Sequence, residues 1–556
     1  MNDISEVDMA KDIRKLQNGS DIRGIAIDGV PGEEVNLGHD EAVAIGGAFA
    51  YWLANRVGKK VGELKICIGS DPRLSGDELK MGLARGMCCR GVKVSDAGLA
   101  STPAMFMSTV LPYFDFDGAV MITASHLPFN RNGFKFFTAQ GGLEKEDIKD
   151  ILQKASLLHS IPEDFSMEPV EVMDAYASHL KTLINARLED NLEGMKIVVD
   201  AGNGSGGFFA TEVLEPLGAD VSGSQFLEPD GSFPNHIPNP ENKDAMASIT
   251  ARVLETGADL GIIFDTDVDR SSAVGPDGKE ISRNSIVALA AALVAADHPG
   301  GTVVTDSVTS NELHEFLEQD LGLKHLRYRR GYRNVINKAI ELDKNGEDAF
   351  LAIETSGHAA YADNYYLDDG AYLAVLIVAA AARLKREGKS IGDLIAGLGA
   401  PAEAEEYRMD ITDEDYVALG ERVLAGLPDF IAGMNGRRAT YGSADKKYTL
   451  NLSLEEPNYE GVRVNFNIVE CTDDAASEEA AGDGAPAEAE SAISEESAAE
   501  AEVREPEVYN GWFLLRQSLH DPVMPLNVES DRKNGIAMIT PLIRLYMRQF
   551  DGIKSL

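Results

Sequence analysis

The sequence predicts an α/β fold: three similar mixed-sheet α/β domains followed by a smaller α+β C-terminal domain, around a central cleft. A strand–loop–helix–strand unit recurs three times along the chain, and the pattern then changes to alternating strands. The chain of 556 residues is also too long for a single hydrophobic core. We therefore expect domains at residues 1–170, 171–297, 298–403 and 404–556.

The repeated unit starts with a short apolar strand, continues through a polar loop and ends in a helix with apolar residues at every fourth position. Its strands begin at Leu64, Met195 and Thr302. Short strands that alternate with amphipathic helices are typical of parallel or mixed sheets. Each copy therefore marks the centre of one α/β domain.

The pattern changes after about residue 404. Apolar and polar residues alternate at 408–411, 448–452 and 462–468, as they do in half-buried antiparallel strands. The chain closes on an amphipathic helix with Ile539 and Ile543 on one face. These features predict the α+β character of the last domain.

An acidic stretch at about 472–507 interrupts this last domain. It is rich in Ala, Glu, Ser and Asp and almost without Arg or Lys. Such a segment cannot bury enough apolar surface to order itself, so we expect a disordered insertion. An inert spacer is the favoured interpretation, with a docking or solubilising segment as the alternative.

Charge and composition exclude several classes of partner. The formal net charge of −40 argues against nucleic acid and against an acidic membrane, so an anionic substrate would need locally concentrated Arg and Lys. No run of about 20 apolar residues could span a membrane. The acidic segment 1–6 is unlike a secretory signal or a transit peptide, which predicts a cytoplasmic protein. The four cysteines have no metal-ligand spacing, and we expect a monomer or weak dimer that acts on small molecules.

Ser125 is the first candidate for chemistry. An apolar strand at 117–122 leads into Thr123–Pro128, and the chain re-enters a strand at 129–137. A serine in such a turn can present its hydroxyl to solvent, although serines in loops are more often structural.

Three aspartates follow a second apolar strand. Asp265, Asp267 and Asp269 occupy alternate positions directly after 258–264, and Arg270 comes next. Carboxylates at this spacing can converge on a hard divalent cation of the size of Mg²⁺. A calcium-binding EF-hand is excluded because the glycine and the final glutamate of that loop are missing. The end of a strand is also where α/β sheets bind ligands.

Two further loops carry polar groups. Glu354 and Ser356 can hydrogen-bond adjacent sugar hydroxyls, and His358 can move a proton. Arg516 and Ser518 can pair with a phosphate, with the guanidinium giving two parallel bonds.

These four elements, in this order, resemble the α-D-phosphohexomutase superfamily, in particular its phosphomannomutase/phosphoglucomutase branch. The resemblance covers nearly the whole chain and includes Gly19–Gly24 near the start. It implies a phosphohexose mutase that interconverts hexose 1-phosphate and hexose 6-phosphate, of glucose, mannose or both, through a phosphoserine at Ser125. Mg²⁺ and a hexose 1,6-bisphosphate are the implied cofactors, and sugar phosphates are the implied partners.

The resemblance also implies a role for each matched residue. Lys135, Arg23 and His358 are candidates for the general acid/base, in that order, and Arg270 offsets charge on the transferred phosphoryl group. The implied substrate-binding residues are Glu354, Ser356, Arg516, Ser518, His126 and Arg333, and the implied metal ligands are Ser125, Asp265, Asp267 and Asp269.

Some positions depart from the family pattern. Leu127 stands where the serine-bearing loop usually has Asn, and Leu519 and His520 replace the usual residues of the phosphate clamp. Tyr332 stands where His is common, within the basic run 329–333. The third loop favours glucose and mannose phosphates over N-acetylglucosamine phosphate.

Other hypotheses remain. A phosphoglucosamine mutase of the same superfamily is the nearest alternative. The segment at 264–268 also resembles the loop of haloacid-dehalogenase-type phosphatases, in which the first Asp is the nucleophile, but this hypothesis leaves Ser125 and His358 unexplained. A non-catalytic sugar-phosphate-binding protein would fit the altered fourth-domain loop only.

Overall fold

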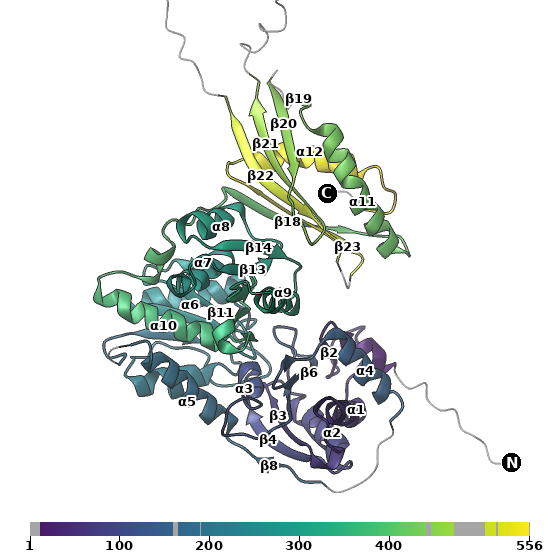
Figure 1. Ribbon diagram of the computed structural model, residues 1–556, viewed down its shortest axis with the longest axis vertical. Coiled ribbons are helices and arrows are strands. Elements are labelled where there is room, and N and C mark those ends of the chain that lie inside the picture. The colour runs from purple at the N-terminus through teal and green to yellow at the C-terminus, as the bar shows by residue number, and fades with distance from the viewer. Residues whose placement is uncertain are drawn as a thin grey trace, which may run out of the picture. The chain divides into compact units, whose positions relative to one another are not determined.

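The computed structural model divides the chain into two compact units. The first contains the described residues up to Thr309 together with Leu313–Leu398, and the second contains Ser310–Glu312 and the described residues from Gly399 onward (Figure 1). The described residues are 12–158, 165–188, 191–440, 446–471, 506–518 and 521–554. The predicted insertion therefore lies outside the described residues, except for its last two positions, as does the acidic N-terminal segment.

The first unit begins with an eight-stranded mixed sheet in the order β1-β2-β6-β5-β3-β4-β8, with β7 paired to β6. Its strands are β1 (Gln17–Asn18), β2 (Asp21–Ile25), β3 (Lys65–Ser70), β4 (Lys93–Leu99), β5 (Gly118–Ile122), β6 (Arg131–Thr138), β7 (Gly141–Gly142) and β8 (Glu168–Pro169). The accompanying helices are η1 (Ile13–Leu16), α1 (His39–Val57), η2 (Val61–Glu63), α2 (Gly76–Cys88), α3 (Thr102–Met107), α4 (Lys145–Ala155) and α5 (Val172–Asn185).

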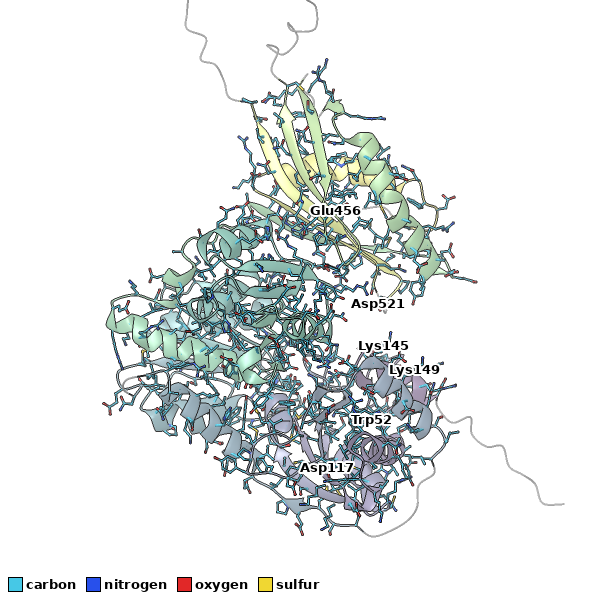
Figure 2. All side chains as sticks on the ribbon, viewed as in Figure 1. Trp52, Asp117, Lys145, Lys149, Glu456 and Asp521 are labelled. Carbon is cyan, nitrogen blue, oxygen red and sulfur yellow. The ribbon has the colours of Figure 1, made fainter. Side chains whose placement is uncertain are left out.

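Helices cover this sheet on both faces because alternate residues of the central strands are apolar. Ile66 and Ile68 pack with α1, α2 and α4, whereas Cys67 packs with α3 and α5. Trp52 on α1 (Figure 2) is 7% exposed and stacks against Phe49, with ring centroids 6.1 Å apart. Burial on both faces explains why these strands read as continuous apolar runs.

A four-stranded sheet follows in the order β12-β11-β10-β9. Its elements are β9 (Ile197–Asp200), η3 (Phe209–Leu214), η4 (Glu215–Leu217), α6 (Lys243–Thr256), β10 (Leu260–Phe264), β11 (Ser271–Val274), β12 (Glu280–Ile281), α7 (Asn284–Ala292) and η5 (Ala295–Asp297). The helix expected after β9 is a π-helical turn followed by a 3₁₀ turn. Pro216 lies in that 3₁₀ turn, and it has no N–H with which to continue an α-helical ladder.

The third sheet has five strands in the order β14-β13-β15-β16-β17. Its elements are β13 (Thr302–Asp306), α8 (Asn311–Glu315), η6 (Phe316–Asp320), β14 (Lys324–Tyr328), α9 (Tyr332–Lys344), β15 (Leu351–Ile353), β16 (Ala359–Tyr361), η7 (Ala362–Asn364), β17 (Leu367–Asp368), α10 (Gly370–Arg386) and η8 (Ile391–Ile395). Side chains of α10 and of all three sheets share one hydrophobic core, which joins the sheets into a single unit.

One arrangement recurs in all three sheets. In each, a strand that pairs in parallel with its neighbour ends in a loop, and the chain returns as an antiparallel strand. The strand pairs on either side of the loop are β5 and β6, β10 and β11, and β15 and β16. We call the three loops the serine loop (123–130), the metal loop (265–270) and the glutamate loop (354–358). Every one of them follows the carboxyl end of a parallel strand.

The second unit is a six-stranded antiparallel sheet in the order β18-β23-β22-β21-β20-β19. Its elements are β18 (Glu403–Asp410), α11 (Tyr416–Met434), β19 (Arg438–Thr440), β20 (Lys447–Leu454), β21 (Val462–Glu470), β22 (Val508–Leu515), β23 (Val523–Ser530) and α12 (Gly535–Met547). Leu450 and Phe466 share a core with both helices, whereas Asn451 and Asn467 on alternate positions hydrogen-bond each other at 3.0 Å.

Three mixed α/β sheets, followed by a C-terminal unit of an antiparallel sheet and two helices, confirm the predicted fold class. The predicted domain boundaries stay a prediction. Within the described ranges, no helix has the length and apolar character needed to cross a membrane.

Candidate active site

The serine loop holds Ser125 in an unusual backbone conformation. Ser125 has a φ of 51° and is 9% exposed. Its N–H donates to Thr123 Oγ1 at 2.9 Å, which closes the turn directly after β5. A non-glycine residue with positive φ is uncommon and points to a local constraint.

The hydroxyl of Ser125 lies between a carboxylate and a guanidinium. Its Oγ donates to Asp265 Oδ2 at 3.2 Å and accepts from Arg270 Nη2 at 2.9 Å. His126 Nδ1 lies 3.3 Å from the same oxygen and 2.7 Å from Arg270 Nη2. Desolvation and the Arg270 cation lower the pKa of His126 to about 3, so the ring is neutral and accepts from the guanidinium.

The metal loop closes on itself. Asp265 N donates to Arg270 O at 3.4 Å, and Arg270 N donates to Asp265 Oδ1 at 3.3 Å. The Arg270 side chain also donates to Asp265 Oδ2 from Nε and from Nη2, each at 3.0 Å. Val268 turns the chain inside the loop with a φ of 68°.

Three buried carboxylates of this loop fit a metal ion. Asp265, Asp267 and Asp269 each place an oxygen within 4.8 Å of the others. Among the described residues, Asp267 Oδ1 has no hydrogen-bond partner, whereas Asp269 Oδ1 lies 3.4 Å from His358 Nε2. Buried oxygens without partners are costly, and an all-oxygen donor set suits Mg²⁺. This triad can therefore hold a divalent cation.

Lys135 on β6 lies against the same carboxylates. Its Nζ is 3.1 Å from Asp267 Oδ2 and also donates to Asp269 Oδ2. Burial would lower the pKa of Lys135, but the two carboxylates outweigh it and raise the pKa well above its usual value. Thr102 donates to Asp267 Oδ2 from Oγ1 at 2.5 Å, which fixes that side chain from α3.

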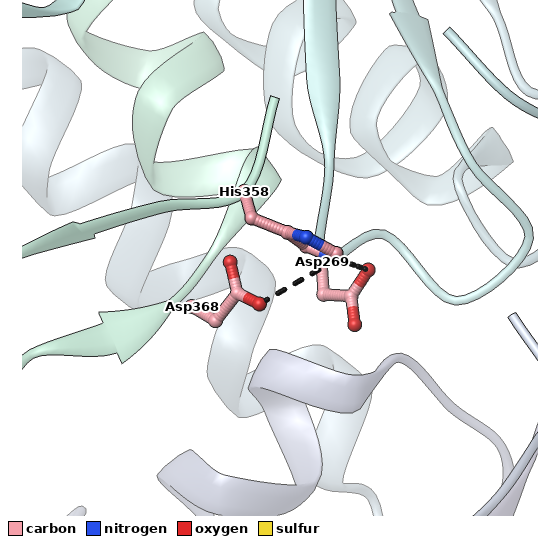
Figure 3. A group of neighbouring side chains, drawn as sticks. All are labelled: Asp269, His358 and Asp368. Carbon is pink, nitrogen blue, oxygen red and sulfur yellow. Dashed lines mark ion pairs between the residues drawn. The ribbon is translucent and has the colours of Figure 1, made fainter. Parts of the chain in front are cut away.

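His358 lies between two carboxylates, as Figure 3 shows. Its Nε2 is 3.4 Å from Asp269 Oδ1 and 3.7 Å from Asp368 Oδ2. Its Nδ1 lies 3.3 Å from Glu354 Oε2 and from Ser356 Oγ. Burial would lower the pKa of His358, but Asp368 and Asp269 raise it well above the usual value, so the ring is an imidazolium at neutral pH.

The glutamate loop is tied to its neighbours. Glu354 Oε1 accepts from Gly331 N at 2.7 Å, and Thr355 Oγ1 donates to Asp306 Oδ2 at 3.0 Å. Burial and the Glu354 charge raise the pKa of Asp306 to about 7. These contacts hold the glutamate loop, which ends at His358, in place.

Arg23 on β2 reaches the serine loop from the N-terminal edge. Its Nη1 donates to Thr123 O at 2.5 Å, and its Nη2 donates to Asp21 Oδ2 at 2.8 Å. The Tyr332 hydroxyl lies 3.2 Å from Asp21 Oδ1, and the Tyr332 ring centroid lies 5.8 Å from Lys135 Nζ. The Tyr332 ring and Lys135 thus line one pocket of the first unit.

Arg333 also lines this pocket, but it already has an anionic partner. Its Nη2 pairs with the carboxylate of Glu144, the residue before α4.

In the second unit, Arg516 and Ser518 lie on one loop after β22. Arg516 N donates to Pro525 O at 3.1 Å, and Ser518 Oγ accepts from Asp521 N at 3.2 Å.

Most predicted site residues of the first unit come together in one place. The contacts above connect Arg23, Ser125, His126, Lys135, Asp265, Asp267, Asp269, Arg270, Glu354, Ser356 and His358. Arg333 lines the pocket with Lys135 and Asp269. Leu519 and His520 lie outside the described residues.

Sequence reasoning missed several residues of the site: Asp21, Arg73, Thr102 and Asp368. It noted Tyr332 only as a departure from the family pattern. The signals available were weak: an aspartate pair before α10, and an arginine two positions after Asp71 in the first polar loop.

Comparisons with known proteins agree on one family. Models of the phosphoglucomutase/phosphomannomutase α/β/α domains I, II and III match residues 14–157, 174–278 and 282–400. A phosphomannomutase/phosphoglucomutase of Pseudomonas putida is 32% identical over 374 residues, which cover 66% of this chain and 77% of the relative. A phosphomannomutase of Salmonella montevideo is 31% identical over 458 residues, which cover 80% of this chain and 94% of the relative. The crystal structure of a phosphoglucomutase/phosphomannomutase family protein from Burkholderia thailandensis aligns with a TM-score of 0.69 at 25% identity, covering 96% of this chain and 97% of that one.

Proposed function

The chain belongs to the phosphoglucomutase/phosphomannomutase family, and we propose that it interconverts hexose 1-phosphate and hexose 6-phosphate through a phosphoserine at Ser125. It is a phosphomutase, an isomerase. The proposed substrates are the phosphates of glucose, of mannose or of both.

One observation carries the proposal: the surroundings of the Ser125 hydroxyl. Asp265 Oδ2 at 3.2 Å and Arg270 Nη2 at 2.9 Å flank the oxygen that would carry the phosphate. Phosphoryl transfer needs an in-line approach and positive charge around the three equatorial oxygens, with little covalent chemistry from the protein. A buried guanidinium beside the hydroxyl supplies part of that charge.

The proposed reaction has two transfers. The free hydroxyl oxygen of a sugar monophosphate attacks the phosphorus of phospho-Ser125, and the bond between that phosphorus and Ser125 Oγ breaks. The hydroxyl proton passes through an acid/base group of the enzyme to Ser125 Oγ, which leaves as a hydroxyl. The hexose 1,6-bisphosphate then turns over, and Ser125 Oγ attacks the phosphorus of its other phosphate and gives up its proton. The bond between that phosphorus and the sugar oxygen breaks and the proton passes to that oxygen, so that the original phosphoenzyme and the isomeric monophosphate result.

A Mg²⁺ ion would be held by Asp265, Asp267, Asp269 and the phosphate on Ser125. When bound, it supplies positive charge that polarises the transferred phosphoryl group. The residues of the chain do the remaining work. Arg270 orients the Ser125 side chain, as the contact between their atoms indicates.

The proton and the sugar have their own candidates. Lys135 and His358 are both cations in this arrangement, so each can give a proton to a leaving oxygen. Arg23, the second candidate from the sequence, already donates to Thr123 O and to Asp21 Oδ2. Glu354 and Ser356 would grip sugar hydroxyls in both orientations of the intermediate.

The remaining roles concern the substrate phosphate. Arg516 and Ser518 would bind the phosphate that is not being transferred, with His126 and Arg333 as further contacts. The cytoplasmic location and the monomeric or weakly dimeric state stay predictions.

Kinetics test the proposal directly. Phosphorus NMR would follow glucose 1-phosphate, mannose 1-phosphate and glucosamine 1-phosphate with the wild type, with Ser125→Ala, and with Ser156→Ala as a control on an exposed serine. We expect one of the two hexose phosphates to have the highest kcat/KM, and Ser125→Ala alone to lose turnover by at least about 10³-fold. A higher kcat/KM for glucosamine 1-phosphate would establish the phosphoglucosamine mutase alternative. Release of inorganic phosphate without isomerisation would support a phosphatase, and binding without turnover a sugar-phosphate-binding protein.

A further inference from the structure

One buried side chain collects the backbone carbonyls of the serine loop. Arg73 Nη2 donates to Ser125 O at 2.5 Å and to Leu127 O at 2.7 Å. Arg73 Nη1 donates to Pro128 O at 2.8 Å and to Arg131 O at 3.0 Å. Four carbonyls from one short stretch of chain thus converge on one guanidinium, which comes from the loop after β3.

The remaining N–H of Arg73, on Nε, makes no hydrogen bond to the described residues but takes part in an ion pair. Its Nε lies 3.3 Å from Asp71 Oδ2, and Asp71 Oδ1 accepts from Arg73 N at 3.0 Å. Arg73 is 2% exposed. The four Nη donors bond to backbone carbonyls and Nε faces the Asp71 carboxylate, so this buried guanidinium has no donor directed at a sugar phosphate. Arg73 therefore acts on the loop and not on the substrate.

The segment between η4 and α6 supports Arg73 from the other side. The Arg73 guanidinium lies over the ring of Phe233, 5.2 Å from its centroid. Gly231 packs so closely that a Cβ there would lie 2.2 Å from Pro72 O, which only glycine avoids. The segment that carries both residues follows β9, and Asp230 N anchors it to Asn203 O at 2.9 Å.

This arrangement explains the backbone of Ser125. A left-handed conformation of a non-glycine residue persists only where its surroundings over-determine it. The Ser125 carbonyl accepts from Arg73, and the Ser125 N–H donates to Thr123 Oγ1 at 2.9 Å, so both polar groups of its backbone are fixed. The side chain is thereby directed to Asp265 and Arg270.

We propose that Arg73 is a positioning residue for phosphoryl transfer: it gathers the carbonyls of the serine loop so that Ser125 Oγ stays beside Asp265 and Arg270. The segment between η4 and α6 holds Arg73 in place through Phe233 and Gly231. The inference rests on the proposed role of Ser125 as the phosphate carrier.

Arg73→Lys tests the proposal. An ammonium is a point donor and cannot reach four carbonyls in the fork geometry of a guanidinium. Rapid-quench experiments would measure the transfer of phosphate from glucose 1,6-bisphosphate to Ser125, and calorimetry would measure the Kd of glucose 1-phosphate. We expect the transfer to slow about 10²-fold, because small misplacements of a reacting group cost this much, while the Kd changes less than about threefold. A purely structural role would not separate the two quantities.

Arg90→Lys is the matched control. Arg90 also donates to a backbone carbonyl, Gly86 O at 2.5 Å, and also lies over an aromatic ring, that of Tyr51 at 5.5 Å. Arg90 comes just after the C-terminal end of α2, whereas Arg73 comes just before its N-terminal end. Arg90→Lys should transfer phosphate at the wild-type rate.

Phe233→Leu provides a second test, and it decides the matter if Arg73→Lys does not fold. It removes the aromatic face under the guanidinium and keeps an apolar side chain, so we expect transfer to slow about three- to tenfold. If Arg73→Lys folds and transfers phosphate at the wild-type rate, the proposal is overturned. If Arg73→Lys does not fold, a wild-type transfer rate in Phe233→Leu overturns it. If the wild type itself acquires no phosphate on Ser125, the proposed function fails, and this inference fails with it.

Discussion

The serine loop and the metal loop follow strands of the same kind but are held differently. The carbonyls of the serine loop accept from the side chains of Arg73 and Arg23. The two ends of the metal loop, Asp265 and Arg270, bond to each other through backbone and side chain, and Thr102 and Lys135 add contacts from outside the loop. The donors of Arg73 lie 52 to 58 residues from the carbonyls they bind, whereas the metal loop closes over five residues.

The difference indicates where each loop is vulnerable. A substitution at Arg73 would release several carbonyls of the serine loop at once, whereas the metal loop keeps the bonds between its own ends when one outside contact is lost. The glutamate loop is intermediate: Asp306 and Gly331 each contact it from a neighbouring element of the same sheet. The four predictions that follow are ordered by the size of the expected effect.

Asp267→Asn should have the largest effect, because it removes one of the three carboxylates that fit the metal ion. We expect activity to fall at least about 10³-fold and the Kd of Mg²⁺ to rise at least about 10²-fold, measured by metal titration after chelator treatment. Asp277→Asn, on the exposed turn before β12, should leave both unchanged. An unaltered Mg²⁺ affinity in Asp267→Asn would place the metal elsewhere.

Arg270→Lys should break the internal closure of the metal loop while leaving the charge. Lysine cannot make the paired bonds to Asp265 together with the bond to Ser125. We expect kcat to fall about 10²- to 10³-fold in steady-state assays. Arg252→Lys in the same domain, where the side chain donates to Gly223 O at 2.7 Å, serves as the control. Retention of activity within tenfold by Arg270→Lys would show that the closure is dispensable.

Lys135 connects the two loops, since it extends from β6 beside the serine loop to Asp267 and Asp269. Lys135→Met should lower kcat about 10²-fold or more, because it removes both a charge and a proton donor. Lys135→Arg keeps the charge and cannot exchange the proton at neutral pH. If proton transfer is the main role, the two variants should be equally slow; if charge is the main role, the arginine variant should recover most of the rate.

The smallest effect concerns His236, in the segment between η4 and α6 that also carries Gly231 and Phe233. His236 Nε2 lies 3.1 Å from Asp200 Oδ2. Burial would lower the pKa of His236, but the bond to Asp200 outweighs it and raises the pKa above its usual range. A histidine with a raised pKa contributes stability that is fully present below the unfolded pKa, about 6.5, and is lost as the pH rises through the folded pKa.

The difference in melting temperature between the wild type and His236→Asn should therefore be larger at pH 6 than at pH 9, by about 2 °C. Differential scanning fluorimetry at the two pH values checks this. His298→Asn, at the pair between His298 Nδ1 and Asp348 Oδ2, is the control. A larger effect of His236→Asn at pH 9 would contradict the direction of the pKa shift.

The positions of the loops also explain which site residues could be predicted from the sequence. The strand ends and the motif residues were predictable, because Ser125, the three aspartates and His358 stand directly after short apolar runs. The second unit was predictable from alternation, and Leu450 and Phe466 are indeed buried. The predicted four-domain boundaries stay a prediction.

What sequence reasoning missed depends on packing between distant segments. Arg73 is one arginine in a polar loop until the fold brings the serine loop to it, and Thr102 meets Asp267 only through the packing of α3. Asp368 is recognisable only once His358 lies beside it. The π-helical turn at Phe209–Leu214 replaces an expected α-helix, because apolar spacing alone does not distinguish the two hydrogen-bond ladders.

Peptide mass spectrometry tests the central claim most directly. The purified protein would be incubated with glucose 1,6-bisphosphate and Mg²⁺, digested, and its phosphopeptides located with and without hydroxylamine treatment. We predict one hydroxylamine-stable phosphate on the peptide that contains Ser125, absent from Ser125→Ala together with mutase activity. A hydroxylamine-labile phosphate on Asp265, or no phosphate on the wild type, would contradict the claim.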